Sequence, residues 1–87
     1  MNYRLTITLN PEGRKDFKYI LSITNTSQTV LGSRITHYGS IGEIEMALIR
    51  AGWHELMEKA RQQLKAGLPF TNVMNILDYQ ISVILNR

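Results

Sequence analysis

Five basic residues and one tyrosine in the first half of the chain are the side chains best suited to binding a partner. They are Arg4, Arg14, Lys15, Lys18, Arg34 and Tyr38. Residues 1–39 carry five basic and two acidic side chains, whereas residues 40–87 carry five of each, so the net charge of +3 belongs to the first half. A basic surface of this kind attracts either an acidic protein patch or the phosphates of a nucleic acid.

Catalytic and metal-binding patterns are missing from the sequence. His37 and His54 fall in different predicted elements and have no neighbour at metal-ligand spacing. The chain has no cysteine, which excludes a disulfide framework, a thiol nucleophile and a cysteine-containing zinc site. Residues 39–42 lack the spacing and the lysine of a phosphate-binding loop. We therefore expect no enzymatic activity, no metal and no cofactor.

Three segments of the first half alternate between apolar and polar residues, which is typical of half-buried strands. They cover about 3–9, 17–24 and 29–38, and the turn-forming residues 10–13 and 25–27 separate them. Gly32 is a candidate for a β-bulge in the third strand. Such short connections predict an antiparallel meander.

The alternation also predicts which side chains face the helices. The inward set is Tyr3, Leu5, Ile7, Phe17, Tyr19, Leu21 and Ile23. The outward set is Arg4, Thr6, Thr8, Lys18, Ile20, Ser22, Arg34, Thr36 and Tyr38. The outward face would then be basic and rich in hydroxyl groups, with Tyr38 as its only aromatic residue.

Helical spacing begins at Ser40, where Ser40 and Glu43 form a capping box. The apolar stripe changes sides near Gly52, which predicts a break between two helices. Trp53 at this break is either an interaction hot spot or a core residue, and we favour the core. Residues 67–69 end the second helix.

Residues 71–86 combine strong β propensity in 79–85 with polar residues at helical spacing. The spacing favours a third helix, with Thr71 as its N-cap. Its apolar arc is wider than that of an ordinary surface helix. Either this helix is central to the core, which we favour, or one side of it forms a homodimer.

The sequence therefore predicts a single α+β domain over residues 1–87, with an antiparallel sheet in 1–39 and two or three helices packed on one face in 40–87. Residues 1–7 alternate instead of forming the apolar region of a signal peptide, and no apolar run is long enough to span a bilayer. We expect a cytoplasmic protein.

Three short strands followed by helices, without an active site, resemble in size and layout the small phage-encoded inhibitors of bacterial defence systems. The resemblance implies an inhibitor or adaptor that occupies a surface of a larger protein. We expect the basic sheet face and the first hairpin to bind an acidic protein surface. The alternative is that the same residues bind nucleic acid.

Overall fold

In the described part of the chain, the sheet has four antiparallel strands in the order β3-β2-β1-β4. In the computed structural model, the strands are β1 (Asn2–Leu9), β2 (Tyr19–Asn25), β3 (Arg34–Tyr38) and β4 (Phe70–Asn75). The structure describes residues 2–13, 15–26 and 33–85. Residue 27 of the connection predicted at 25–27 lies outside these ranges. Gly32, the candidate for a β-bulge, lies outside them as well. The predicted antiparallel sheet in an α+β fold is confirmed, but it contains a fourth strand.

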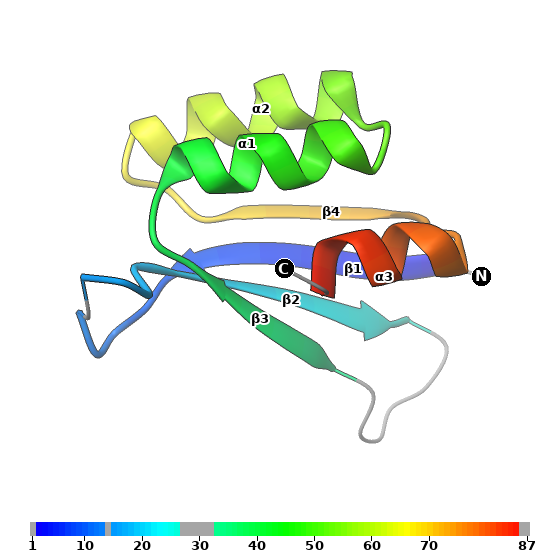
Figure 1. The fold of residues 1–87 in the computed structure, drawn as a ribbon, viewed down its shortest axis with the longest axis horizontal. Helices are drawn as coiled ribbons and strands as arrows, with labels where there is room; N and C mark the ends of the chain where they lie inside the picture. Colours follow the sequence, from blue (N-terminus) through cyan, green and yellow to red (C-terminus); the bar gives the residue numbers. More distant parts are fainter. Residues whose placement is uncertain (1, 14, 27–32, 86–87) are drawn as a thin grey trace.

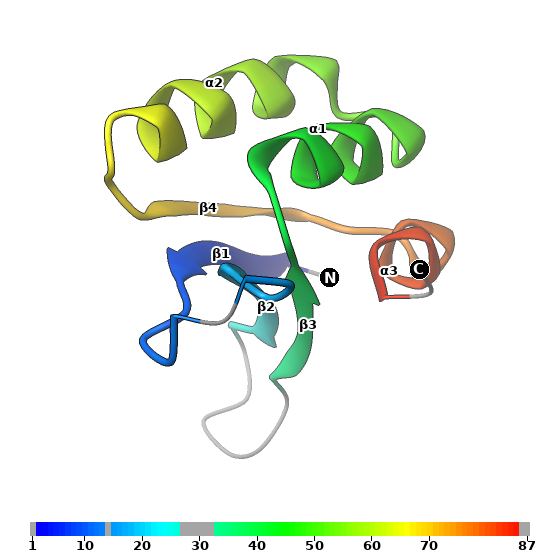
Figure 2. The same ribbon diagram turned by 60° about the vertical axis from the view of Figure 1, so that its left-hand side comes forward.

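Among the described residues, three helices lie on one face of this sheet: α1 (Ile41–Arg50), α2 (His54–Lys65) and α3 (Asp78–Leu85). Figures 1 and 2 show α1 and α2 side by side above the strands. The Ser40 hydroxyl accepts a hydrogen bond from the Glu43 amide at 3.2 Å, and the Glu43 carboxylate accepts one from the Gly39 amide at 2.6 Å. The predicted capping interaction is therefore present, although Glu43 reaches Gly39 instead of Ser40.

The predicted break at Gly52 is confirmed. The amide of Gly52 donates to the Ile49 carbonyl and that of Trp53 to the Leu48 carbonyl, which is the Schellman pattern that ends a helix. Gly52 has a φ of 86°, a left-handed conformation that glycine adopts without strain. The chain therefore turns back after α1, and α2 packs beside it.

The prediction of a helix over 71–86 is wrong for its first part. Phe70–Asn75 forms β4, which pairs with β1 in the register Ile7↔Phe70. A strand alternates its side chains, so Phe70 enters the core while Thr71 is exposed and caps no helix. The available edge of β1 decides this conformation, because pairing satisfies the backbone groups of both strands. Within the described residues 71–85, only Asp78–Leu85 is helical.

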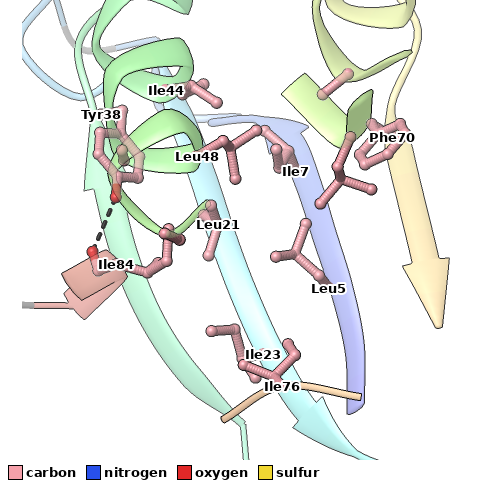
Figure 3. Packing of buried hydrophobic residues seen from close by; sticks show 14 of the residues in the cluster. Leu5, Ile7, Leu21, Ile23, Tyr38, Ile44, Leu48, Phe70, Ile76 and Ile84 are labelled. Atoms are coloured by element: carbon pink, nitrogen blue, oxygen red, sulfur yellow. Dashed lines mark hydrogen bonds between the residues drawn. The ribbon is translucent and has the colours of Figure 1, made fainter. Parts of the chain in front are cut away.

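The core lies between the sheet and the helices (Figure 3). Each strand contributes its inward residues, among them Leu5, Leu21, Tyr38 and Phe70, and the helices contribute apolar residues such as Leu48. Phe17, which was predicted to face inward, is instead 40% exposed. Every buried strand residue lies on the helix-facing side, so the opposite side of the sheet is left uncovered by the described residues.

Candidate interaction surface on the uncovered sheet face

The uncovered sheet face is a surface that the core does not use. Pairing between the strands brings twelve side chains together on it. They are Asn2, Arg4, Thr6, Thr8, Ile20, Ser22, Thr24, Ile35, His37, Thr71, Val73 and Asn75. We call these residues the outer face. Five of the seven outer-face residues of β1 and β2 occur in the outward set that the sequence predicted: Arg4, Thr6, Thr8, Ile20 and Ser22.

Hydroxyl groups occupy the middle of the outer face and bond to one another across the strands. The Thr6 and Thr71 hydroxyls lie 3.1 Å apart across β1 and β4. The Thr24 hydroxyl lies 2.8 Å from that of Ser33, just before β3. These bonds hold short side chains close to the sheet, so the middle of the outer face is a polar surface of low relief.

Three exposed basic side chains lie on β1 and in the β1–β2 hairpin, where Glu12 and Asp16 are exposed as well. Arg4 is exposed on the outer face, and Lys15 and Lys18 are exposed in the β1–β2 hairpin. The predicted turn at the hairpin tip is confirmed: the Gly13 amide donates to the Asn10 carbonyl, and Gly13 has a φ of 67°. Arg14 lies outside the described residues. The structure thus leaves three of the predicted basic residues exposed in this region.

The predicted orientation of the third strand is wrong. Tyr38 pairs with Tyr19, and Arg34 pairs with Ile23, so both lie on the helix-facing side together with Thr36. Tyr38 is only 1% exposed, whereas Arg34, at the start of β3, is exposed. A one-residue difference in register exchanges the two faces of a strand. The pairing of β3 with β2 decides which side chains of β3 face the helices, and the local sequence does not specify this pairing.

In place of Arg34, Thr36 and Tyr38, β3 presents Ile35 and His37 on the outer face. Ile35 is 57% exposed on this edge strand, and Val73 is 54% exposed on β4, the other edge strand. Two exposed β-branched residues therefore flank the polar middle. Sequence reasoning missed Val73 because it assigned this segment to a helix. It missed Ile35 because it placed the alternate residues of the third strand, Arg34, Thr36 and Tyr38, on the outward face.

The end of the outer face nearest the hairpin carries two rings. The ring of Phe17 packs edge-on against that of His37, with centroids 5.6 Å apart and planes at 73°. Together with Asn10 and Glu12 they line an open hollow of about 250 Å³. The β1–β2 hairpin, which carries Lys15 and Lys18, therefore also presents the aromatic ring of Phe17 at this end of the outer face.

The break between α1 and α2 offers a second hollow. It measures about 500 Å³ and is lined by Gly52, Trp53, His54, Glu55, Leu56, Lys59 and Asn72. Trp53 is partly buried and packs against the core, in line with the structural role that the sequence favoured. This hollow brings no second histidine to His54, and its lining lacks a set of ligands for a metal ion.

Within residues 2–13, 15–26 and 33–85, no three His, Cys, Asp or Glu side chains converge as a metal-binding group. In the same ranges, no helix has the length and apolar character needed to cross a bilayer. Comparison of the chain with protein-family models, with curated proteins and with solved structures finds no match in any of the three.

Proposed function

We propose that the protein is a non-enzymatic interaction module that binds an acidic surface of a larger protein through its outer face and β1–β2 hairpin. It acts as an inhibitor or adaptor, and the cytoplasm is the compartment we propose for it. The observation that supports this proposal is the composition of the outer face. Arg4 stands beside hydroxyl-bearing residues, and the exposed Ile35 and Val73 lie at the two edges.

An acidic protein surface complements this face in two ways. Arg4, Lys15 and Lys18 attract carboxylates and steer the approach of the partner. Apolar edge residues and threonine methyl groups then supply surface that is removed from water on contact. Protein interfaces combine such apolar contacts with polar groups, whereas the phosphate backbone of a nucleic acid gains little from exposed Ile35 and Val73.

A second candidate function is binding of single-stranded nucleic acid. The observation that favours it is the Phe17–His37 ring pair near Lys15 and Lys18, because bases stack on aromatic rings beside positive charge. Sheets that read RNA generally stack bases on two or more aromatic residues of their strands. Here Tyr38, the aromatic residue predicted for that role, lies in the core, so we rank this function second.

The test compares two triple variants with equal charge changes. One carries Arg4→Glu, Lys15→Glu and Lys18→Glu; the other carries Arg50→Glu, Lys59→Glu and Lys65→Glu, which are exposed on the helices. Each is used as bait in extracts of the source organism, and captured proteins are quantified by mass spectrometry. The proposal expects a protein that the wild type and the helix variant capture and the first variant loses. Equal capture by both variants would overturn it.

Direct titration with single-stranded DNA and RNA at low salt tests the second candidate. Binding that weakens steeply as salt rises and that the first variant loses would support nucleic-acid binding through the same face. Absence of binding at low salt would eliminate it. Capture from extracts therefore tests protein binding, and titration at low salt tests nucleic-acid binding, so each function can be rejected without the other.

A further inference from the structure

A third hollow lies where the connection from α2 to β4 meets the end of β1 (Figure 1). It measures about 260 Å³ and is lined by Thr8, Leu9, Tyr19, Leu64, Gly67, Leu68 and Pro69. We call it the leucine hollow. Leu64 is buried, whereas Leu9 and Leu68 are 58% and 52% exposed. Part of this hollow thus belongs to the core, and two leucines of its lining remain open to solvent.

Leu68 is exposed because the end of α2 gives it no apolar neighbour. The Leu68 amide donates to the Gln63 carbonyl and the Gly67 amide to the Leu64 carbonyl, which is the Schellman pattern. In this motif, the residue at the place of Leu68 frequently makes an apolar contact with the residue that supplies the first carbonyl or with the one before it. Both are glutamine here. At the end of α1, the corresponding residue Trp53 packs against the core. The side chain of Leu68 is therefore available for contact with another molecule.

Leu9 brings backbone groups as well as a side chain to the leucine hollow. The Asn10 amide donates to the Lys18 carbonyl, so the even-numbered residues of β1 bond to β2 and the backbone groups of Leu9 point to the other side. On that side, the pairing with β4 ends at Ile7↔Phe70. No described strand continues alongside Leu9, so its amide and carbonyl can pair with the backbone of a bound protein segment.

The charges around the leucine hollow favour an acidic occupant. None of the described residues that line it is acidic, and the exposed Lys18 directly precedes one of them. The two acidic residues of the hairpin lie toward β3 instead. Glu12 lines the other hollow beside His37, and the carbonyl of Asp16 lies close to Gly39, just after β3. A segment with carboxylates is therefore attracted to this side of the hairpin.

We propose that the leucine hollow binds a large apolar side chain carried by an acidic segment of the partner protein, whose backbone pairs with that of Leu9. Thr8 belongs both to the outer face and to the leucine hollow, so the two surfaces are continuous. This inference rests on the proposed function for the choice of an acidic protein as partner. It adds the anchor, because an apolar side chain seated in a pocket supplies binding free energy while exposed charges steer the approach.

Titration of the full chain with short peptides tests the chemistry of the occupant. The probe is the acetylated hexapeptide Glu-Asp-Leu-Leu-Asp-Glu, labelled with a fluorophore and followed by anisotropy up to millimolar protein. One control peptide has serine in place of both leucines, and the other has lysine in place of all four acidic residues. The probe should bind about tenfold more tightly than either control. Equal binding of all three peptides, or no binding of the probe, would overturn the proposal.

Two leucine variants locate the site. Leu68→Ser removes one wall of the leucine hollow and should raise the dissociation constant of the probe about tenfold. Leu77→Ser is the matched control, because Leu77 is 50% exposed just before α3, and it should leave the constant unchanged. In the wild type, the probe should shift the NMR signal of the Leu9 amide and slow its hydrogen exchange. Equal effects of the two variants, or an unchanged Leu9 amide, would contradict the assignment. Circular dichroism verifies that both variants retain the fold.

A second copy of this chain is the competing occupant. Sedimentation equilibrium of the wild type and of Leu68→Ser over micromolar to millimolar concentrations tests it. The proposal expects the same oligomeric state for both proteins. A wild type that dimerises and a Leu68→Ser variant that stays monomeric would show that a second copy fills the leucine hollow, and would overturn the proposal.

Capture from extracts separates this inference from the proposed function. Leu68→Ser should lose the protein that the variant with Arg4, Lys15 and Lys18 changed to glutamate loses, and Leu77→Ser should keep it. If both leucine variants keep it, the proposed function stands and the leucine hollow lies outside the interface. If the charge variant keeps it while the probe still binds at Leu68, the proposed function fails and the leucine hollow remains a site for acidic, leucine-bearing segments.

Discussion

The hydroxyl of Tyr38 donates a hydrogen bond of 2.8 Å to the backbone carbonyl of Ile84 in the interior of the protein (Figure 3). This contact joins the last residue of β3 to the final turn of α3. The last four carbonyls of a helix have no partner within it, so the Tyr38 hydroxyl satisfies a group that would otherwise be buried without one. The bond gives α3 a defined position against the sheet.

Replacing Tyr38 with Phe should lower the free energy of unfolding by about 1–2 kcal/mol. The ring still fills its place in the core, but the Ile84 carbonyl loses its donor in a buried position. Urea unfolding followed by tryptophan fluorescence measures the change. Tyr79→Phe removes the same hydroxyl from an exposed tyrosine and should change stability by less than about 0.5 kcal/mol. Equal effects would contradict the structural role of Tyr38.

Gln80→Met should lower the free energy of unfolding by about 2 kcal/mol. The buried Gln80 amide donates to the Ala51 carbonyl at 2.9 Å and accepts from the Leu77 amide at 2.9 Å. Methionine keeps the volume but leaves both backbone groups unpaired, and an unsatisfied buried group costs about 1–3 kcal/mol. Thermal unfolding compares it with Gln63→Met on the exposed side of α2. A stability loss as large for Gln63→Met would refute this explanation.

Two glycine-to-alanine substitutions should change stability in opposite directions. Gly52→Ala should destabilise by about 1–2 kcal/mol: a Cβ there meets nothing within 4 Å, but the φ of +86° is strained for alanine. Gly42→Ala lies in the first turn of α1, where a Cβ makes only an ordinary contact. Alanine should stabilise this helix by about 0.5 kcal/mol. Chemical denaturation of both variants checks the signs.

Ser40→Ala should destabilise the protein by about 1 kcal/mol, because the Glu43 amide loses the hydroxyl that caps α1. Ser40→Asp should retain most of the stability, since its carboxylate accepts the same hydrogen bond and lies at the positive end of the helix. Ser82→Ala, at an exposed position within α3, serves as the control in the same unfolding measurement. Rescue by aspartate distinguishes loss of the cap from a general effect of the substitution.

The sequence by itself determines the elements whose signals are local. Alternation defines β1 and β2, because a strand at the surface of a core has one buried and one exposed side. Ser40 and Glu43 mark the start of α1 because only short-range hydrogen bonds are involved. Gly52 marks its end because few other residues adopt the left-handed conformation. Arg4 on the outer face follows from β1 alone.

Tertiary structure decides the features that depend on a distant partner. Phe70–Asn75 becomes β4 because β1 has an open edge that accepts it, although the polar spacing of the following residues suits a helix. The face of β3 depends on its pairing with β2 and on the Ile84 carbonyl that receives the Tyr38 hydroxyl. Register and edge pairing join residues far apart in the sequence, so no local pattern specifies them.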